Sequence, residues 1–585
     1  MTTPDSARPR PVAQTEAELG FTPLPAVRWL TPKVLVSTGV QSLIANIFGS
    51  YADKRELQGS LPATVHRHAG GDEFWFDFVA DVGDGFDATY SVALLLAAQA
   101  IELPGHDPLP RGELLVMGGD QVYPSASTRA YEDRSKGVYR AALPAEGDDG
   151  PTLLALPGNH DWYDGLTAFL RVFAQRRPFG GWKTEQTRSY FAVELPHRWW
   201  LFAIDTQFDD YVDAPQLEYF RSVSADLRPG DGVILCTSSP AWVDAGSGGH
   251  TKSYDTIEFF EREIVRSRGA EIRVMLSGDA HHYARYAEND GTRQRITCGL
   301  GGAFLAATHE LPEELHLPPP QSRVREKSER ASYDLVERYP TLDTSKKFAT
   351  GILRLPWRNP GFWALTGLFQ TLMTLAVLYG LVRTLGRAAP GFFGLVASWT
   401  PAVIVGVVLV LGGMFFAKLE REVTGPVPVV AGVLHAVAHL ALSVGWAFVV
   451  IWLYTDVLPD GPIADWSTLV IVLGGTPSVI GFIDAEVVAV YLMIASRFGI
   501  NLNEVMAGQA IEDYKGFLRL RIGDDGDLTI HPVKLETISR AWRPNPDGAP
   551  DEPWLLPTVA LRPELIEEPI VVTRVSTPRV DPVNP

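Results

Sequence analysis

Polar side chains of metal-binding type follow short apolar segments at several points in the N-terminal half of the chain. They are Asp81, Asp120, Asn159–His160, Ser238 and Asp279–His281. A pair of hard metal ions requires carboxylates, an amide oxygen and imidazoles from several loops, and one carboxylate usually bridges both ions. A single acid after a strand is most often a helix cap or a turn residue. The ordered set is therefore what indicates a two-metal site.

The apolar segments that precede these side chains have the length and composition of buried strands. They are bounded by Gly and acidic residues and cover 74–81, 113–120, 152–160, 199–206, 232–236 and 272–279. Stretches with helical spacing, such as 89–101 and 255–268, lie between them. In α/β sheets of this kind, functional residues collect at the carboxyl ends of the strands. The pattern predicts an α/β domain with its site at that edge.

The ordered motifs resemble those of the calcineurin-like metallophosphoesterases. The family's blocks D-x-H, G-D-x-x, G-N-H-[DE], a strand-end His and G-H-x-H correspond here to 81–83 (DVG), 119–123 (GDQVY), 158–161 (GNHD), Ser238 and 278–281 (GDAH). The resemblance covers about residues 74–310, and GNHD together with GDxxY is its specific part. It implies a four-layer αββα sandwich that hydrolyses a phosphate ester with a metal-activated water.

Three positions depart from the family pattern. Gly83, Ser238 and Asp279 stand where the family has histidines. A site that has oxygen ligands in place of imidazole nitrogens favours harder metal ions. The departures leave open an alternative function, in which a catalytically degenerate domain serves as a membrane sensor or scaffold and only binds a phosphorylated ligand.

The GDxxY form resembles the purple acid phosphatase branch, and the GDxH form resembles alkaline phosphatase D-like enzymes. Together they imply that one ion is held by Asp81, Asp120, Tyr123 and His281, and the other by Asp120, Asn159 and Asp279. The cofactor implied is a pair of divalent or mixed-valence ions, drawn from Fe, Mn, Zn or Ca.

His160 matches the family's transition-state residue. The resemblance implies that its imidazole lies beside the phosphoryl oxygens, held by Asp161, and acts as a general acid or charge stabiliser. The substrate implied is a phosphate monoester or diester, either soluble or lipid-associated. Nothing in the sequence distinguishes these substrates.

The composition excludes several classes of protein. The 585 residues carry 51 Lys and Arg against 69 Asp and Glu, a net charge of −18. A basic surface is the usual footprint of phosphate-backbone binding, so no nucleic-acid partner is expected. Two cysteines exclude a disulfide scaffold. The first 28 residues are Pro-rich and polar and have no apolar signal segment.

Four long apolar blocks follow the α/β region, and a spanning helix needs about 20 apolar residues. They cover 359–382, 388–417, 423–455 and 466–496, and the fourth is interrupted by Asp484 and Glu486. We expect an all-α transmembrane bundle, with a broken or re-entrant fourth block as the alternative. In the third block, His435 and His439 are four residues apart, which suits metal or proton chemistry as well as helix packing.

Loop charges predict the orientation. Nine Lys and Arg flank one side of the blocks and two flank the other, which places both large polar regions in the cytoplasm of a multi-pass cell-membrane protein. The domains expected are an N-terminal extension (1–60), the metallophosphoesterase domain (61–345), the transmembrane domain (359–498) and a β-containing tail (499–585), whose Gly/Asp run at 523–527 predicts a hairpin. A transporter with a regulatory domain is a further alternative.

Overall fold

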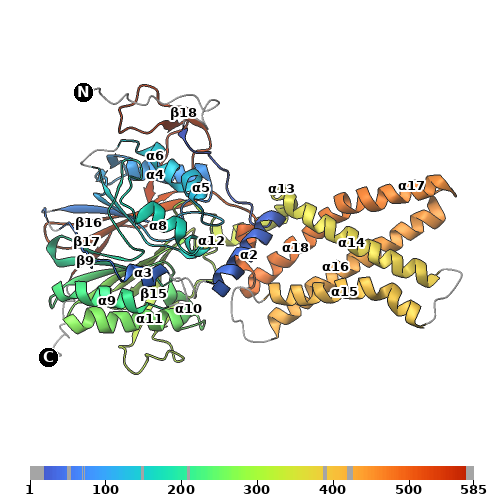
Figure 1. Ribbon diagram of the computed structural model, residues 1–585, viewed down its shortest axis with the longest axis horizontal. Helices are drawn as coiled ribbons and strands as arrows, with labels where there is room; N and C mark the ends of the chain where they lie inside the picture. The colour runs from blue at the N-terminus through green and yellow to red at the C-terminus, as the bar shows by residue number, and fades with distance from the viewer. Residues whose placement is uncertain are drawn as a thin grey trace. The chain divides into compact units, whose positions relative to one another are not determined.

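The computed structural model describes residues 19–48, 54–68, 70–71, 73–145, 150–206, 211–385, 392–417 and 426–574. The chain divides into two compact units. The α/β unit comprises Met1–Val27, Thr38–Leu342 and Glu512–Pro585, and the helical unit comprises Arg28–Ser37 and Asp343–Ile511. Figure 1 labels the helices and strands of both. The predicted extension 1–60 is therefore described only from residue 19.

The smaller sheet of the α/β unit carries the strands that precede the first predicted site residues. Within the described residues its order is β20 (Glu564–Leu565), β17 (Leu528–Leu535), β16 (Lys515–Ile522), β2 (Phe74–Val79), β5 (Leu114–Met117), β6 (Thr152–Ala155) and β7 (Lys183–Thr184), with β21 (Ile570–Val572) beside β17. β2, β5 and β6 are parallel neighbours, with Phe78 opposite Val116 and Val116 opposite Leu154. Apart from Asp77 and Thr152, their residues are apolar, which fits strands buried on both faces.

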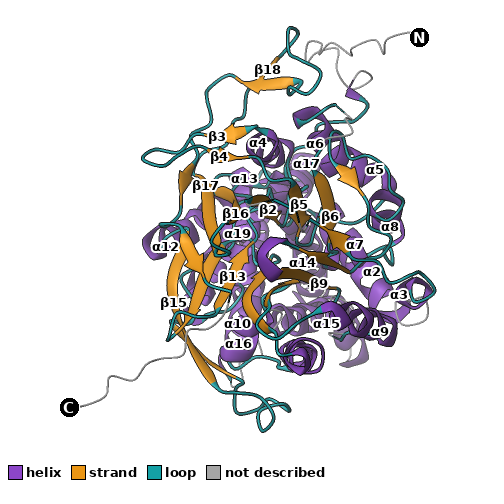
Figure 2. Ribbon diagram, turned by 90° about the vertical axis from the view of Figure 1, so that its left-hand side faces the viewer, coloured by secondary structure: helices purple, strands orange, loops and turns teal. Residues whose placement is uncertain are grey.

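The larger sheet carries the remaining predicted strands. Among the described residues its order is β1 (His66–Arg67), β8 (Phe191–Glu194), β9 (Trp199–Ile204), β10 (Gly232–Thr237), β11 (Glu271–Ser277), β13 (Gln294–Cys298), β12 (Tyr283–Glu288), β15 (Ala331–Tyr339) and β14 (Glu314–Leu317). β9, β10, β11 and β13 are parallel, and the strands after them are antiparallel. Figure 2 shows both sheets in orange among purple helices. The prediction of an α/β domain is confirmed.

Each sheet has its own hydrophobic core with a set of helices. The smaller sheet packs with α4 (Phe86–Ala97), α6 (Gly137–Ala142) and α8 (Thr167–Phe173). The larger sheet packs with α9 (Ala214–Val223), α10 (Ala241–Gly246) and α11 (Lys252–Phe260). Short connections add α3 (Lys54–Gln58), α5 (Thr128–Tyr131) and α7 (Asn159–Trp162). This packing leaves the strand ends and their loops to build the polar site.

The C-terminal hairpin is part of the smaller sheet. β16 and β17 pair around the predicted Gly/Asp turn, and β16 also pairs antiparallel with β2, Leu520 opposite Phe76. Arg519 of β16 reaches Asp77 of β2 through two hydrogen bonds of 2.8 and 3.0 Å, and both side chains are buried. The predicted hairpin is confirmed, and it lies inside the α/β unit rather than in a separate tail.

The helical unit contains four helices, among the described residues, that are long and apolar enough to cross a membrane. They cover Pro360–Thr384, Val396–Phe416, Val427–Val457 and Pro462–Phe498. The helices that supply them are α14 (Pro360–Leu385), α15 (Phe392–Phe416), α16 (Val427–Trp452), α17 (Pro462–Val470) and α18 (Gly481–Ala495). In the sequence, α12 (Leu342–Thr350) and α13 (Leu355–Arg358) precede them and α19 (Leu502–Ala507) follows them. α2 (Pro32–Phe48) begins in the helical unit and belongs to the α/β unit from Thr38 on.

The fourth apolar block forms one continuous helix. A π-helical segment, Ile471–Ile480, joins α17 to α18 and contains Pro477. Proline lacks an N–H, and the wider π-helical turn accommodates it without ending the helix. Within the described residues the block is therefore unbroken, and its path across the membrane stays a prediction. The loops 386–391 and 418–425, which hold Arg387, Lys418 and Arg421 of the orientation prediction, lie outside the described residues.

Candidate functional site

The parallel strands of the smaller sheet bring the first predicted site residues to one edge. Asp81 follows β2, Asp120 follows β5 and His160 lies in α7 after β6. The backbone N–H of Asp81 donates to the Gly119 carbonyl (3.0 Å), and the N–H of His160 donates to Asp120 Oδ1 (2.9 Å). The carboxyl ends of parallel neighbours share an edge, which is why residues far apart in the sequence meet here.

The larger sheet completes the site from the end of β11. The N–H of Asp279 donates to Asp81 Oδ1 (3.0 Å), which ties the two strand ends together. His281 is buried and lies two residues further along, with its ring 4.5 Å from that of Phe304, edge to face. All the residues named for the first ion thus come from the facing ends of β2, β5 and β11.

The Tyr123 hydroxyl is the meeting point of these side chains. It donates to Asp120 Oδ2 (3.2 Å) or to Asp81 Oδ1 (3.4 Å), and it lies 3.0 Å from His281 Nε2. Tyr123 itself is fully buried. Within the described chain, no three His, Cys, Asp or Glu side chains already surround one point in metal-binding geometry. The four predicted ligands of one ion instead converge on the phenol oxygen of one of them.

The backbone at this edge adopts left-handed conformations. Asp81, Asp120, Asp279 and His281 have φ of 58°, 51°, 69° and 48°. Such values are uncommon for residues other than glycine, and they cluster at functional sites where surrounding structure holds them. Gly158 allows the close approach of the GNHD loop, because a Cβ at this position would overlap the Asp120 carboxylate.

Gly83, one of the three departures, has a structural reason. Its φ is 71°, and a Cβ there would collide with the Gln121 carbonyl. A histidine therefore cannot stand at this position in the present backbone. Tyr123 donates its own N–H to the Gly83 carbonyl (3.2 Å), so the loop that excludes the imidazole also positions the phenol.

Buried oxygens at the site lack hydrogen-bond partners within the described residues. They are Asp81 Oδ2, Asn159 Oδ1 and Ser238 Oγ. A Cβ on Gly119 would lie 3.4 Å from Ser238 Cβ, so Ser238 borders the Asp120 loop. Asp279 is exposed at the rim. Buried oxygens without donors are costly, and a cation would satisfy them. The orphaned oxygen of Asn159, which belongs to the predicted second set, therefore suits a hard ion that takes oxygen ligands.

The pKa values of the site's ionisable groups also suit a bound cation. Burial, followed by repulsion from Asp120 and Asp279, raises the pKa of Asp81 well above its usual value. Burial raises the pKa of Asp120 to about 7. Burial lowers the pKa of His281 to about 3, which keeps the imidazole in the neutral form that ligates metals. Clustered carboxylates beside a neutral imidazole form a donor set that positive charge would stabilise.

His160 and Asp161 have different partners from those expected. His160 is half-buried, and its Nδ1 lies 2.7 Å from the Pro124 carbonyl, which can only accept and so fixes the proton on Nδ1. Asp161 is fully buried and accepts from the Tyr131 hydroxyl and from the N–H groups of Gly158 (2.8 Å) and Gln121 (3.3 Å). Asp161 therefore holds the GDxxY and GNHD loops together, and the Pro124 carbonyl orients His160.

Two contributors were missed by sequence reasoning. Tyr131 binds the Asp161 carboxylate from α5. Lys515, at the start of β16, is fully buried, and burial lowers its pKa to about 8 while Asp84 opposes this. The next residue, Gly516, donates its N–H to the Leu300 carbonyl (3.0 Å), in the loop whose Ala303 N–H donates to the Asp81 carbonyl (2.8 Å). In the sequence, Lys515 is one basic residue in a hairpin of alternating polar and apolar residues, and this pattern does not indicate that its side chain is buried near the site.

Comparison with known proteins adds no assignment. No protein-family model matches the chain, and no curated protein matches it. Functional inference therefore rests on the motifs and on the geometry of the site.

Proposed function

We propose that the chain is a membrane-anchored, metal-dependent phosphoesterase. The observation that carries this proposal is the convergence of Asp81, Asp120 and His281 on the Tyr123 hydroxyl, where the ends of β2 and β5 lie beside the end of β11 of the other sheet. Three oxygen groups and one imidazole from separate loops suit one hard ion, and within the described residues Asp81 keeps a second oxygen, Oδ2, free of hydrogen-bond partners for it. The orphaned oxygen of Asn159 suits the second ion.

The residues of the site divide the chemical work. Asp81, Asp120, Tyr123 and His281 would hold one ion, and the second would take Asp120, Asn159 and Asp279. When bound, the ions supply positive charge for the phosphoryl oxygens and lower the pKa of water. His160 gives or takes a proton at Nε2, because Nδ1 is committed to the Pro124 carbonyl. Asp161 keeps the GDxxY and GNHD loops in register.

The finer features of the assembly belong to the same proposal. Two sheets, each with its own layer of helices, support a four-layer αββα sandwich of the metallophosphoesterase type. The four apolar helices support an anchor in the cell membrane, and the loop charges favour a cytoplasmic catalytic unit. The substrate is a phosphate ester, whose source is either a soluble compound or a lipid headgroup.

The experiment is a phosphatase and phosphodiesterase panel on the full chain in detergent or vesicles, with Mn²⁺, Fe²⁺, Zn²⁺ or Ca²⁺ added in turn. Asp120→Asn should lose activity together with most bound metal, since this carboxylate serves both ions. His160→Gln should retain metal and lower turnover by roughly 10²–10⁴-fold, the usual effect of a general acid. Metal content is measured alongside activity.

Matched controls are Asp226→Asn and His316→Gln, which alter exposed groups of the α/β unit. Both should keep wild-type metal content and turnover. Full activity in Asp120→Asn would refute the assignment of the site. Binding of phosphate compounds without hydrolysis under every metal condition would instead support the sensor. A parallel assay on lipid vesicles and on a small soluble ester separates the two substrate sources.

A further inference from the structure

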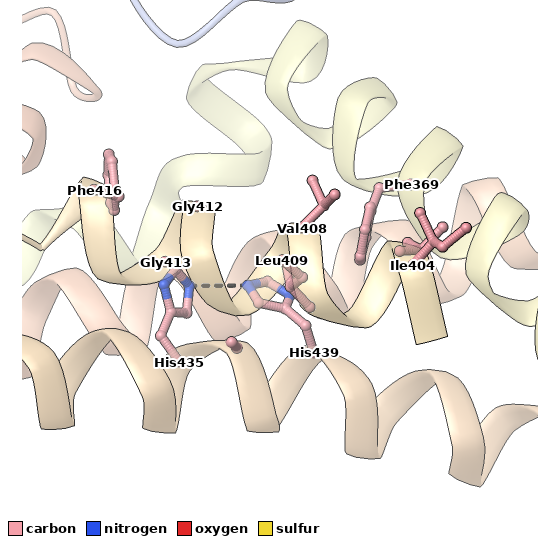
Figure 3. A pocket seen from close by; sticks show the side chains of 11 residues that line it. Phe369, Ile404, Val408, Leu409, Gly412, Gly413, Phe416, His435 and His439 are labelled. Atoms are coloured by element: carbon pink, nitrogen blue, oxygen red, sulfur yellow. Dashed lines mark hydrogen bonds between the residues drawn. The ribbon is translucent and has the colours of Figure 1, made fainter. Parts of the chain in front are cut away.

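The helical unit contains a continuous chain of buried ionisable side chains. His439 Nδ1 lies 2.5 Å from Asp484 Oδ1, and His439 Nε2 lies 2.9 Å from His435 Nε2. The histidines are on α16 and the acid is on α18, and all three residues are buried. Figure 3 shows the two imidazoles pointing toward each other beneath α15. The four-residue spacing noted in the sequence thus forms part of a longer hydrogen-bonded chain.

Neighbouring polar groups fix the Asp484 end. The Gln370 side chain donates from Nε2 to Asp484 Oδ1 (2.6 Å), and its Oε1 accepts from Ser443 Oγ (2.6 Å). Gln370 and Ser443 are fully buried, so neither group is a chance surface contact. The second oxygen, Asp484 Oδ2, is buried and has no hydrogen-bond partner within the described residues. Ionisable groups inside a membrane are costly and usually serve function.

The hydrogen bonds allow only one proton arrangement when Asp484 is ionised and both imidazoles are neutral. A carboxylate only accepts, so His439 Nδ1 must donate to it. A neutral imidazole has one N–H, so His439 Nε2 accepts and His435 Nε2 donates. The order of donors is then His435 to His439 to Asp484, and His435 Nδ1 is the atom at which a further proton can enter.

The surroundings contain few other charges. Beside the two imidazoles lies a cavity of about 470 Å³. The residues of α14 and α15 that line it, among those that the structure describes, are apolar residues and glycines such as Phe369, Phe416 and Gly413, and none of them is titratable. α18 contributes Tyr491, whose ring stacks on His435 at 3.9 Å between centroids, and Glu486, which lines a cavity of about 750 Å³ with His435.

The Tyr491 side leads to one more acid. The Tyr491 hydroxyl donates to Asn501 Oδ1 (2.9 Å), and Asn501 Nδ2 donates to Glu504 (3.3 Å). This acid reaches the imidazoles only through the tyrosine and the amide. Among the described residues, His435, His439 and Asp484 do not surround one point as metal ligands. They are instead linked in a row by hydrogen bonds, an arrangement suited to proton transfer.

We propose that His435, His439 and Asp484 form a proton-binding relay inside the helical unit. A proton from water binds His435 Nδ1, the Nε2 proton of His435 passes to His439 Nε2, and the Nδ1 proton of His439 passes to Asp484. One proton enters in total. Both hydrogen bonds of the row, His435–His439 and His439–Asp484, are kept, because donor and acceptor exchange roles in each. The chain changes from an anion to a neutral form, which suits a low-dielectric membrane interior.

The test uses the full chain in lipid nanodiscs with ¹⁵N-labelled histidine. Infrared spectroscopy follows the protonated carboxyl group, and NMR follows the imidazole nitrogens as the pH is lowered. In the wild type, the carboxyl signal and the His435 and His439 shifts should appear with one common midpoint. Asp484→Asn should remove the carboxyl signal and displace the histidine midpoint, and His439→Gln should separate Asp484 from His435.

Asp465→Asn is the control, because it removes an exposed carboxyl group at the start of α17 in the same helical unit. It should leave the common midpoint unchanged. The wild-type measurement alone can refute the relay, even where a variant fails to fold. Three results would each overturn the relay. The first is a different pH midpoint for each histidine, and the second is a carboxyl signal that persists in Asp484→Asn. The third is a metal ion, bound at one per chain, that changes the NMR shifts of both imidazoles.

Discussion

The buried Arg519–Asp77 ion pair joins β16 of the C-terminal hairpin to β2. Breaking this pair tests how strongly the hairpin is held in the α/β unit. Arg519 donates from Nε and Nη2 to the two Asp77 oxygens and from Nη1 to the Leu109 carbonyl. Neither side chain is accessible to solvent. Asp77→Asn removes the negative charge and leaves a guanidinium buried in the sheet without a counter-charge.

The expected cost follows from burial. Loss of one partner of a buried ion pair destabilises by about 3–5 kcal/mol, because the remaining charge is uncompensated. Since about 1.4 kcal/mol corresponds to a tenfold change in an equilibrium constant, detachment of β16 should become roughly 10²–10⁴-fold more frequent. Replacement of both residues by apolar ones of similar size, Asp77→Leu with Arg519→Met, should restore most of the stability.

Limited trypsin digestion of the full chain measures this opening. Arg521 lies near the end of β16, opposite Thr529 of β17 and Trp75 of β2, so cleavage there requires this end of the strand to detach from both neighbours. The cleavage rate follows the opening equilibrium when reclosing is fast. The control is Glu73→Gln, which breaks the half-exposed Arg521–Glu73 pair on the same strands. A surface pair contributes at most about 1 kcal/mol, so cleavage should rise less than about fivefold. Wild-type cleavage in Asp77→Asn, or a double variant no better than the single ones, would refute the reasoning.

Three further outcomes are expected. Burial lowers the pKa of His531 from 6.5 to about 4, so between these pH values only the unfolded chain binds a proton at this residue. The free energy of unfolding, measured with urea, should therefore fall as the pH falls from 6.5 to about 4. His531→Gln should make the free energy of unfolding depend less on pH in this range. If Tyr123 ligates ferric iron, the iron-loaded chain should show a tyrosinate charge-transfer band, and Tyr123→Phe should lose the band; identical spectra would exclude the ligand. Single cysteines at Asp460 and Asp524 should differ toward an impermeant reagent in intact cells, with Asp460 labelled and Asp524 shielded; the reverse pattern would invert the orientation.

The sequence alone determined the features that depend on local pattern. Short apolar runs that end in polar residues predicted β2, β5 and β11 and the edge at which Asp81, Asp120 and Asp279 lie, because strand periodicity and turn chemistry act over a few residues. Uncharged blocks of membrane-spanning length predicted the four apolar helices for the same reason. The Gly/Asp run at 523–527 predicted the hairpin turn.

Tertiary structure alone decided which distant groups meet. Arg519 and Asp77 are 442 residues apart, and no local pattern or motif indicates their pairing. The motif resemblance placed Tyr123 with His281, but only the fold shows the phenol oxygen 3.0 Å from the imidazole. Asp161 binds the loop backbone and Tyr131 instead of His160, because a buried carboxylate takes the donors that packing brings nearest. Gly83 excludes an imidazole because the Gln121 carbonyl occupies the space of its Cβ. Such choices depend on steric fit between segments that only the folded chain brings together.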